Sequence, residues 1–200
     1  MKLNTTHAKT AVCCLLFILL LAMAQLTAAQ EPIATLRAPQ EQPVLAGATT
    51  DVELVLETAD LDIAAVAFVL HVDPQLVQLD ATDGDSDGVP DSVVVHAPAN
   101  MARSVTWEAA TGKLNVALFG LFPPLPTLQD GVLLTVTFKV AADAAVGAAH
   151  HAENGRLPLL LEQVSLGDTE GNDVPANAVD GSLLIREPAV KIALPVIKRS

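Results

Sequence analysis

The sequence predicts an all-β fold, an antiparallel sandwich or jelly roll of about eight or nine short strands. Three observations support this prediction. Apolar and polar residues alternate with a period of two in several segments, turn-forming dipeptides separate those segments, and no stretch shows an amphipathic helical pattern. The 200 residues suit one such domain, which follows an N-terminal signal segment.

The signal segment is expected at residues 1–29. A basic start precedes the apolar run Ala11–Ala24, and small residues follow the run near its end. Because the run is shorter than the ~20 residues of a membrane-spanning helix, we expect cleavage in preference to an uncleaved anchor. Both cysteines, Cys13 and Cys14, lie in this segment, so the mature chain should have no disulfide. An extracellular or cell-surface location is expected, with no membrane span in the mature chain.

The predicted sandwich domain covers residues 30–187, and residues 188–200 form a basic and apolar tail. The tail contains Lys191, Lys198 and Arg199 and no acidic residue. It is interpreted as a sorting or docking tail, with a disordered end or an added edge strand as alternatives.

The predicted strands follow one another along the domain. In Asp51–Glu57 the apolar residues Val52, Leu54 and Leu56 share one face. Ala64–Val72 is more continuously apolar, as in a strand covered on both faces, although a short buried helix remains an alternative. The remaining predicted strands are Ser104–Glu108, Lys113–Val116, Leu134–Val140 and Leu157–Leu161.

Turn chemistry separates these strands. The turn-forming dipeptides each contain glycine: Ala46-Gly47, Thr111-Gly112, Asp130-Gly131, Gly171-Asn172 and Asp180-Gly181. Three prolines between Phe122 and Thr127 prevent a regular hydrogen-bond ladder there.

Several segments resemble the cohesin family in order and spacing. Phe68–Pro74, followed by Leu76, resembles the cohesin strand that ends in an aspartate-proline turn. Asp130-Gly131 leads into Phe138-Lys139-Val140, which resembles the cohesin strand with a phenylalanine-lysine-valine end. Gly181–Ile185 resembles the closing strand, and the whole resemblance extends from about Ile33 to Arg186.

The resemblance implies a nine-stranded jelly-roll β-sandwich without catalytic residues. Cohesins belong to secreted or cell-surface scaffolds and bind dockerin modules of other proteins, usually polysaccharide-degrading enzymes. The resemblance therefore implies a dockerin-bearing partner and a role in a cellulosome-like, polysaccharide-degrading system. It indicates no individual partner-binding residue.

An acidic loop carries the sharpest local chemistry. Aspartates occupy positions one, three, five and nine, with glycine at six, as in the first part of an EF-hand calcium loop. Alternate carboxylates can converge on one hard cation, and the position-seven carbonyl can add an oxygen. The expected Ca²⁺ ligands are Asp83, Asp85, Asp87, Asp91 and the carbonyl of Val89, in a weak site with Kd ~10⁻⁴ to 10⁻³ M.

This loop also departs from the EF-hand. Position twelve is Val94 instead of a bidentate glutamate, and no helices flank the loop. The pattern is more typical of aspartate-rich loops in extracellular repeats, where other residues or water complete the shell, and Asp80 is a further candidate donor. A solvated turn without a metal ion remains the alternative.

Other polar residues give weaker signals. His150-His151 is expected to be an exposed pair, because adjacent strand residues point to opposite faces. His71, beside the aspartate-proline turn, is interpreted as structural, and His96 is isolated. No serine, histidine and acid can be grouped into a catalytic triad, so an enzyme is the least supported class.

The aromatic residues separate two other function classes. Phe68, Trp107 and Phe138 fall on apolar strand phases and are expected in the core. Phe119 and Phe122 are the best candidates for an exposed contact patch, although core packing is favoured for them too. A carbohydrate-binding module of the same fold is the alternative to a protein-binding module. Because only 3% of the residues are aromatic, few rings could stack on sugars, and protein binding is favoured.

The charge balance argues against a nucleic-acid partner. The formal net charge is −12, and loss of Lys2 and Lys9 with the signal segment lowers it to −14. Binding to phosphates requires a basic face, which an acidic chain of this kind does not supply.

Overall fold

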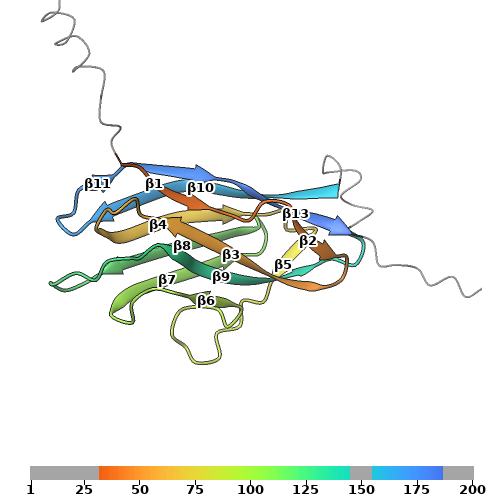
Figure 1. Ribbon diagram of the computed structural model, residues 1–200. Helices are drawn as coiled ribbons and strands as arrows, with labels where there is room; N and C mark the ends of the chain where they lie inside the picture. Colours follow the sequence, from red (N-terminus) through yellow and green to blue (C-terminus); the bar gives the residue numbers. More distant parts are fainter. Residues whose placement is uncertain (1–31, 145–154, 187–200) are drawn as a thin grey trace, which may run out of the picture. The chain divides into compact units, whose positions relative to one another are not determined.

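The computed structural model describes residues 32–144 and 155–186, and the regular elements in these ranges are β-strands. They form two packed sheets (Figure 1). The strands are β1 Ala34–Arg37, β2 Gln42–Leu45, β3 Thr49–Glu57, β4 Ile63–His71, β5 Val77–Leu79, β6 Val93–Val95, β7 Met101–Glu108, β8 Lys113–Gly120, β9 Gly131–Val140, β10 Arg156–Asp168, β11 Asp173–Val174, β12 Ala176–Val179 and β13 Gly181–Arg186.

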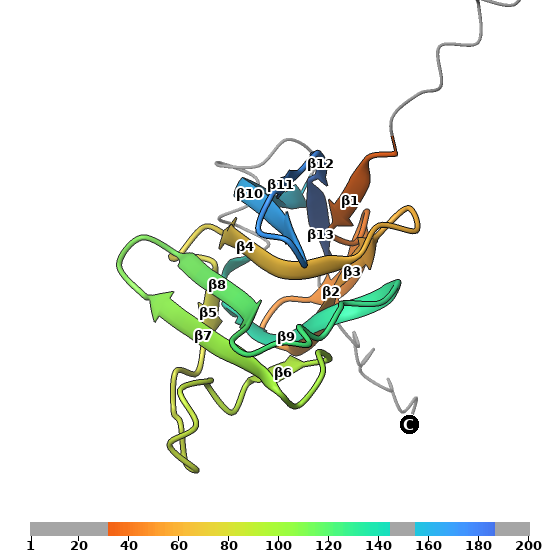
Figure 2. The same cartoon turned by 90° about the vertical axis from the view of Figure 1, so that its left-hand side faces the viewer.

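The first sheet has the order β12-β1-β3-β9-β5, and β6 also pairs with β9. The second sheet has the order β2-β13-β10-β4-β8-β7, and β11 pairs with β10. Two neighbouring pairs, β1 with β12 and β2 with β13, are parallel, and the others are antiparallel. Figure 2 shows β10, β4, β8 and β7 following one another across the second sheet.

Both ends of the described domain change sheet at the same place. β1 leads into β2 just as β12 leads into β13, and the two crossings lie side by side. Ser182 N donates to the carbonyl oxygen of Pro39 at 2.9 Å, and Ala38 N donates to that of Val179 at 3.0 Å. A Cβ at Gly181 would lie 2.4 Å from the Pro39 oxygen, so a side chain at this crossing would clash with the backbone.

The core lies between the sheets and follows the period-two alternation of the sequence. Val52, Leu54 and Leu56 of β3 are fully buried, whereas Asp51 before them and Glu53 between the first two are exposed. The facing layer is supplied mainly by β4 and β8, whose buried inward residues are Val66, Phe68, Leu70, Leu114, Val116 and Leu118. This apolar burial is the main favourable contribution to folding.

The structure confirms the predicted all-β sandwich. Ala64–Val72 coincides with β4 apart from one residue at each end, so the helical alternative is wrong. The predicted strand Leu157–Leu161 is only the first part of β10, which continues to Asp168. The described residues form 13 strands where about nine were expected, because short segments such as β5, β6 and β11 pair separately.

The proline-rich segment between Phe122 and Thr127 is a loop, as predicted. The expected signal segment, the tail at 188–200 and His150-His151 lie outside the described residues. In the part of the chain that the structure describes, no helix has the length and apolar character needed to cross a membrane.

The alternation of β3 yields the first prediction. Leu54→Ala removes a fully buried side chain and should lower the free energy of unfolding by about 2–5 kcal/mol. Glu53→Ala, one residue earlier on the exposed face, should change it by less than about 0.5 kcal/mol. Urea unfolding followed by Trp107 fluorescence measures both, and equal losses would show that the two faces of β3 are wrongly assigned.

Candidate functional site

The outer face of the second sheet is composed largely of small side chains. Strand pairing places four residues in one row across β7, β8, β4 and β10, here called the central row: Ser104, Ala117, Ala67 and Ser165. The next row contains Ala102, Ala65 and Gly167 beside a single large residue, Phe119. The outward residues of β7, β8, β4 and of β10 between Leu160 and Gly167 are called the docking face below.

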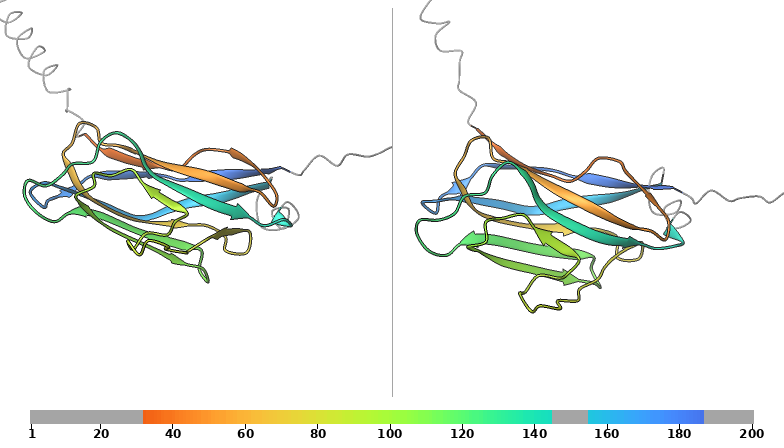
Figure 3. Two further views of the ribbon diagram at one scale, coloured as in Figure 1. Left: turned by 90° about the horizontal axis from the view of Figure 1, so that it is seen from below. Right: turned by 60° about the horizontal axis from the view of Figure 1, so that its bottom comes forward.

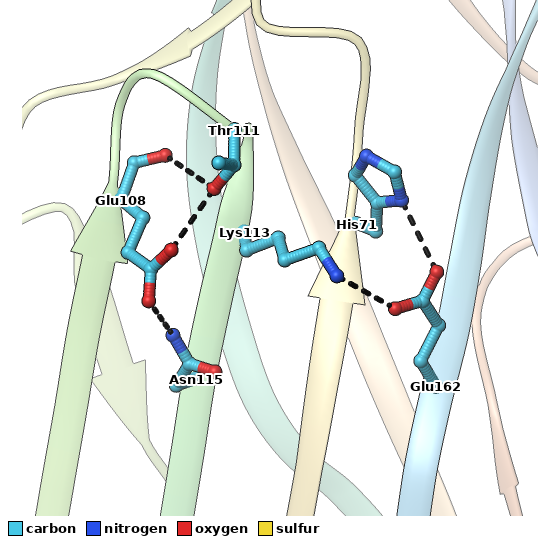
Figure 4. Close-up of polar contacts among 6 residues, drawn as sticks. All are labelled: His71, Glu108, Thr111, Lys113, Asn115 and Glu162. Atoms are coloured by element: carbon cyan, nitrogen blue, oxygen red, sulfur yellow. Dashed lines mark hydrogen bonds and ion pairs between the residues drawn. The ribbon is translucent and has the colours of Figure 1, made fainter.

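One end of the docking face carries a cluster of charged side chains, shown in Figure 4 and here called the polar end. Lys113 Nζ donates to Glu162 Oε2 at 3.1 Å, and His71 Nδ1 lies 3.2 Å from Glu162 Oε1. All three side chains are about one-third exposed. Hydrogen bonding from Lys113, and then from His71, holds the pKa of the Glu162 carboxyl below its ordinary value.

A second polar group extends this end onto β7. Glu108 Oε1 accepts a hydrogen bond from Asn115 Nδ2 at 3.1 Å, and Glu108 Oε2 accepts one from Thr111 Oγ1 at 3.0 Å (Figure 4). The polar end therefore contains two carboxylates from the two outer strands, Glu108 and Glu162, with Lys113 on β8 between them. This arrangement holds charged groups in fixed positions at one boundary of an otherwise uncharged face.

The opposite end of the docking face is apolar. Phe119 is 40% exposed, and the loop that follows β8 exposes Leu121 by 55% and Phe122 by 79%. The expectation that core packing is favoured for Phe119 and Phe122 is thus wrong, and their role as candidates for an exposed patch remains. The reason is positional: Phe119 falls on the outward phase of β8, and the loop after Gly120 leaves the sheet.

The outer face of the first sheet is different because it is charged. Arg37 Nη2 and Glu57 Oε1 form an ion pair at 2.8 Å, and Thr137 Oγ1 donates to Asp51 Oδ1 at 2.6 Å. Lys139 is exposed on the same sheet. Charged groups are depleted at the centres of protein interfaces, so this face is the poorer candidate for docking.

The acidic loop joins β5 to β6 and projects from the sandwich (Figures 1 and 3). Carboxylate oxygens of Asp83, Asp85 and Asp91 lie within 4.8 Å of one another. Among the expected side-chain ligands, Asp87 is not part of this group. Asp87 Oδ1 instead accepts a hydrogen bond from Val89 N at 2.8 Å, and the Val89 side chain is buried in the core.

Backbone donors hold the loop carboxylates in place. The two carboxylate oxygens of Asp83 accept hydrogen bonds from Asp87 N at 3.2 Å and Gly88 N at 3.0 Å. Gly84 N lies 3.2 Å from each carboxylate oxygen of Asp91. Gly88 has a φ of 84°, the left-handed conformation that glycine adopts without strain.

The remaining sequence candidates do not join a site in the described residues. Asp80 Oδ1 accepts bonds from the hydroxyl and the backbone N of Thr82, which lower its pKa and keep it outside the loop cluster. His96 Nε2 contacts Thr135 Oγ1 at 2.9 Å on the first sheet. Phe68 and Phe138 are buried as expected, and Trp107 is partly buried with its ring centroid 6.2 Å from that of Phe138.

The sequence alone did not identify the contacts of Glu162 with Lys113 and His71, or the position of Gln163 on the docking face. His71, Lys113 and Glu162 come from three separate strands, so their contact depends on strand order and register. A signal was present for part of it, because Lys113 begins an alternating predicted strand and His71 is the one polar residue in the apolar run Ala64–Val72. Their cross-strand pairing requires knowing that β4 and β8 are neighbours.

The contacts of Glu162 yield a prediction about acid stability. Because the folded-state pKa is lowered, Glu162 adds stability above its unfolded pKa of about 4.3, and loses it as pH falls through the folded value. Glu162→Gln should therefore be less stable than the wild type at pH 7, with the difference disappearing toward pH 2. Urea midpoints across this range measure it, and a difference that does not change with pH would contradict the role given to the carboxylate.

Comparison with known proteins agrees with this architecture. No curated protein matches the chain. A non-cellulosomal cohesin from the archaeon Archaeoglobus fulgidus aligns with a TM-score of 0.56 at 17% identity, over 77% of this chain and 91% of that one. The cohesin of the Coh-OlpC-Doc435 complex from Clostridium thermocellum, described as a type I cohesin-dockerin complex, aligns with a TM-score of 0.59 at 15% identity, over 81% and 99%.

A third similar structure is the third ScaB cohesin of R. flavefaciens, solved in complex with a group 1 dockerin. It aligns with a TM-score of 0.51 at 13% identity, over 80% of this chain and 99% of that one. At these identities the structural likeness establishes the fold. The family model described as "Cohesin domain" matches residues 41–185, which is most of the chain. On the strength of that match, the chain belongs to the cohesin family.

Proposed function

We propose that the chain is a non-catalytic docking module whose docking face binds a dockerin-bearing protein. The observation that carries this proposal is an uncovered sheet face with small uncharged residues at its centre and exposed aromatic and aliphatic residues at one end. Two of the similar cohesins were solved with a dockerin bound, which supports the same class of partner here.

Interface composition supports this face over the other one. Cores of protein interfaces are depleted of charge and enriched in aromatic residues, and a polar rim surrounds them. The docking face has this order: Phe119 and the small central row adjoin the polar end with Glu108, Lys113 and Glu162. A polysaccharide would require stacked aromatic rings, whereas Phe119 is the single aromatic residue on the described strands of this face.

We further propose that the protein is exported and acts at the cell surface or outside the cell. The apolar segment Ala11–Ala24, with a basic start and small residues after it, supports export. The association of cohesins with polysaccharide-degrading enzymes supports a role in extracellular polysaccharide breakdown. In this role the module recruits an enzyme made by another gene and performs no chemistry itself.

The acidic loop is proposed to hold a Ca²⁺ ion that stabilises the domain. Asp83, Asp85 and Asp91 would supply carboxylate oxygens and the Val89 carbonyl a further one, while Asp87 would need to give up its hydrogen bond from Val89 N to join them. Three carboxylates at this separation repel one another, and a divalent cation would remove that cost. The buried Val89 ties the loop to the core, so an ordered loop would also brace the edge formed by β5 and β6.

The docking proposal predicts the effect of shortening Phe119. Phe119→Ala should weaken binding to a dockerin-bearing partner by at least about tenfold, because it removes the largest apolar side chain on the docking face. Val94→Ala, which shortens another exposed apolar side chain on the first sheet, is the matched control and should leave the affinity unchanged. Isothermal titration of the mature chain against dockerin modules encoded in the same genome measures both.

Two results would contradict the docking proposal. One is that no dockerin module binds while the wild type is retained on cellulose or chitin, which would favour the carbohydrate-binding alternative. The other is that Val94→Ala weakens binding as strongly as Phe119→Ala, which would place the interface on the first sheet.

The calcium proposal predicts a metal-dependent melting temperature. With a Kd of ~10⁻⁴ M, 10 mM Ca²⁺ should stabilise the fold by about 2.7 kcal/mol and raise Tm by roughly 5–10 °C. Asp85→Ala should abolish that rise, while Asp62→Ala, in the loop between β3 and β4, should retain it. Calorimetry with and without a chelator tests this, and an identical rise in wild type and Asp85→Ala would rule out the loop as the binding site.

A further inference from the structure

A hollow of about 210 Å³ lies in the docking face at its central row. The outward-facing residues that line it are Ala67, Val69, Ser104, Asn115, Ala117 and Gln163. They come from all four strands of the face, β4, β7, β8 and β10. The sheet surface dips here because alanine and serine stand between the larger Phe119 on one side and Glu162 on the other.

The lining restricts what the hollow can accept. Ala67, Ala117 and Val69 make its floor apolar, and no charged side chain lines it. A charged group would therefore lose its hydration there without gaining a partner. The volume is also below the ~300–1,000 Å³ of pockets that enclose a whole small-molecule ligand. One aliphatic side chain projecting from a protein surface meets both requirements, since it is uncharged and small enough for the volume.

The wall formed by β10 has an unusual backbone. Glu162 pairs with Val69 and Ser165 with Ala67, so β10 contains one extra residue between these pairs. Gln163 has a φ of 54°, a left-handed conformation that is unfavourable for a residue with a side chain. The bulge turns Val164 toward the core and places Gln163 on the docking face directly after Glu162.

The polar groups around the hollow are available to a partner. Neither the Gln163 amide nor the Ser104 hydroxyl has a hydrogen-bond partner within residues 32–144 and 155–186, and both residues are exposed. Non-glycine residues in left-handed conformations cluster at functional sites, where the surrounding structure holds them. The left-handed residue of the bulge thus lies at the edge of the hollow.

We infer that this hollow is the specificity pocket of the docking face, taking one aliphatic side chain of the dockerin-bearing partner while Gln163 hydrogen-bonds the partner beside it. This inference rests on the proposed function and adds the class of partner residue that is recognised. The central position of the hollow agrees with it, because the residues that dominate binding energy cluster near the centre of an interface.

Three variants of the mature chain test the inference by isothermal titration. The probe is the dockerin module that binds the wild type most tightly. Ala117→Leu fills the hollow from an outward position and should weaken binding at least about thirtyfold. Ala81→Leu adds the same atoms at an exposed position in the loop after β5, outside the docking face, and should change the affinity by less than about threefold.

Gln163→Gly separates binding from folding. Glycine adopts a positive φ without strain, so this variant should have the same or a higher Tm than the wild type. It should nevertheless bind the dockerin several-fold more weakly, because the hydrogen-bonding side chain is gone. A structural bulge without a binding role would give a raised Tm and an unchanged affinity, which would remove Gln163 from the proposal.

A double-mutant cycle identifies the side chain that enters the hollow. Each exposed aliphatic residue of the dockerin is replaced by alanine and titrated against the wild type and Ala117→Leu. One replacement should weaken binding to the wild type at least about tenfold and have little further effect on Ala117→Leu, since the two changes disrupt the same contact.

The outcomes distinguish this inference from the proposed function. If no dockerin module binds the wild type, the proposed function fails and the inference fails with it. If a dockerin binds and Ala117→Leu retains the wild-type affinity, or all the dockerin changes are additive with it, the inference is overturned while the docking function stands. Urea midpoints of each variant confirm that it is folded, and Gln163→Gly still tests the site if Ala117→Leu is not.

Discussion

The rest of the structure depends on the pairing register between β4 and β8. This register decides which side chains of the second sheet face the core and which face outward. Phe68 opposite Val116 places large side chains in the core, and Ala67 opposite Ala117 places small ones outside. A slip of one residue in either strand would exchange the two sets, because side chains alternate between faces. The same register therefore makes the apolar core and the shallow uncharged face that we assign to docking.

The chemistry of the docking face is graded along its strands. Its polar end fixes charges through the Glu162 contacts with Lys113 and His71, while its centre has no charge and its other end exposes Phe119. Such a gradient would favour one orientation for a partner whose own apolar and charged groups match the two ends. The bulge at Gln163 is a local departure from regular pairing. It adds a hydrogen-bonding side chain beside the small residues of the central row.

Period-two alternation predicted most of the fold, including β3 and the core positions of Phe68 and Phe138. The predicted strand ended at Leu161 because the continuous apolar run stops at Glu162, and the extra residue Gln163 reverses the phase of β10 beyond it. The acidic loop could be located from aspartate spacing, but the grouping of Asp83, Asp85 and Asp91 without Asp87 depends on backbone hydrogen bonds. The docking face was not predictable, because it requires the order of strands distant in sequence.

We propose that the outward side of β10, β4, β8 and β7 is the surface that meets the partner. Amide chemical-shift mapping of the isotope-labelled mature chain during addition of a dockerin module tests it most directly. The largest shifts are expected at Ala67, Ala117 and Gln163, with small shifts across β1, β3 and β9. The largest shifts on β1, β3 and β9, with β4 and β8 unaffected, would contradict it.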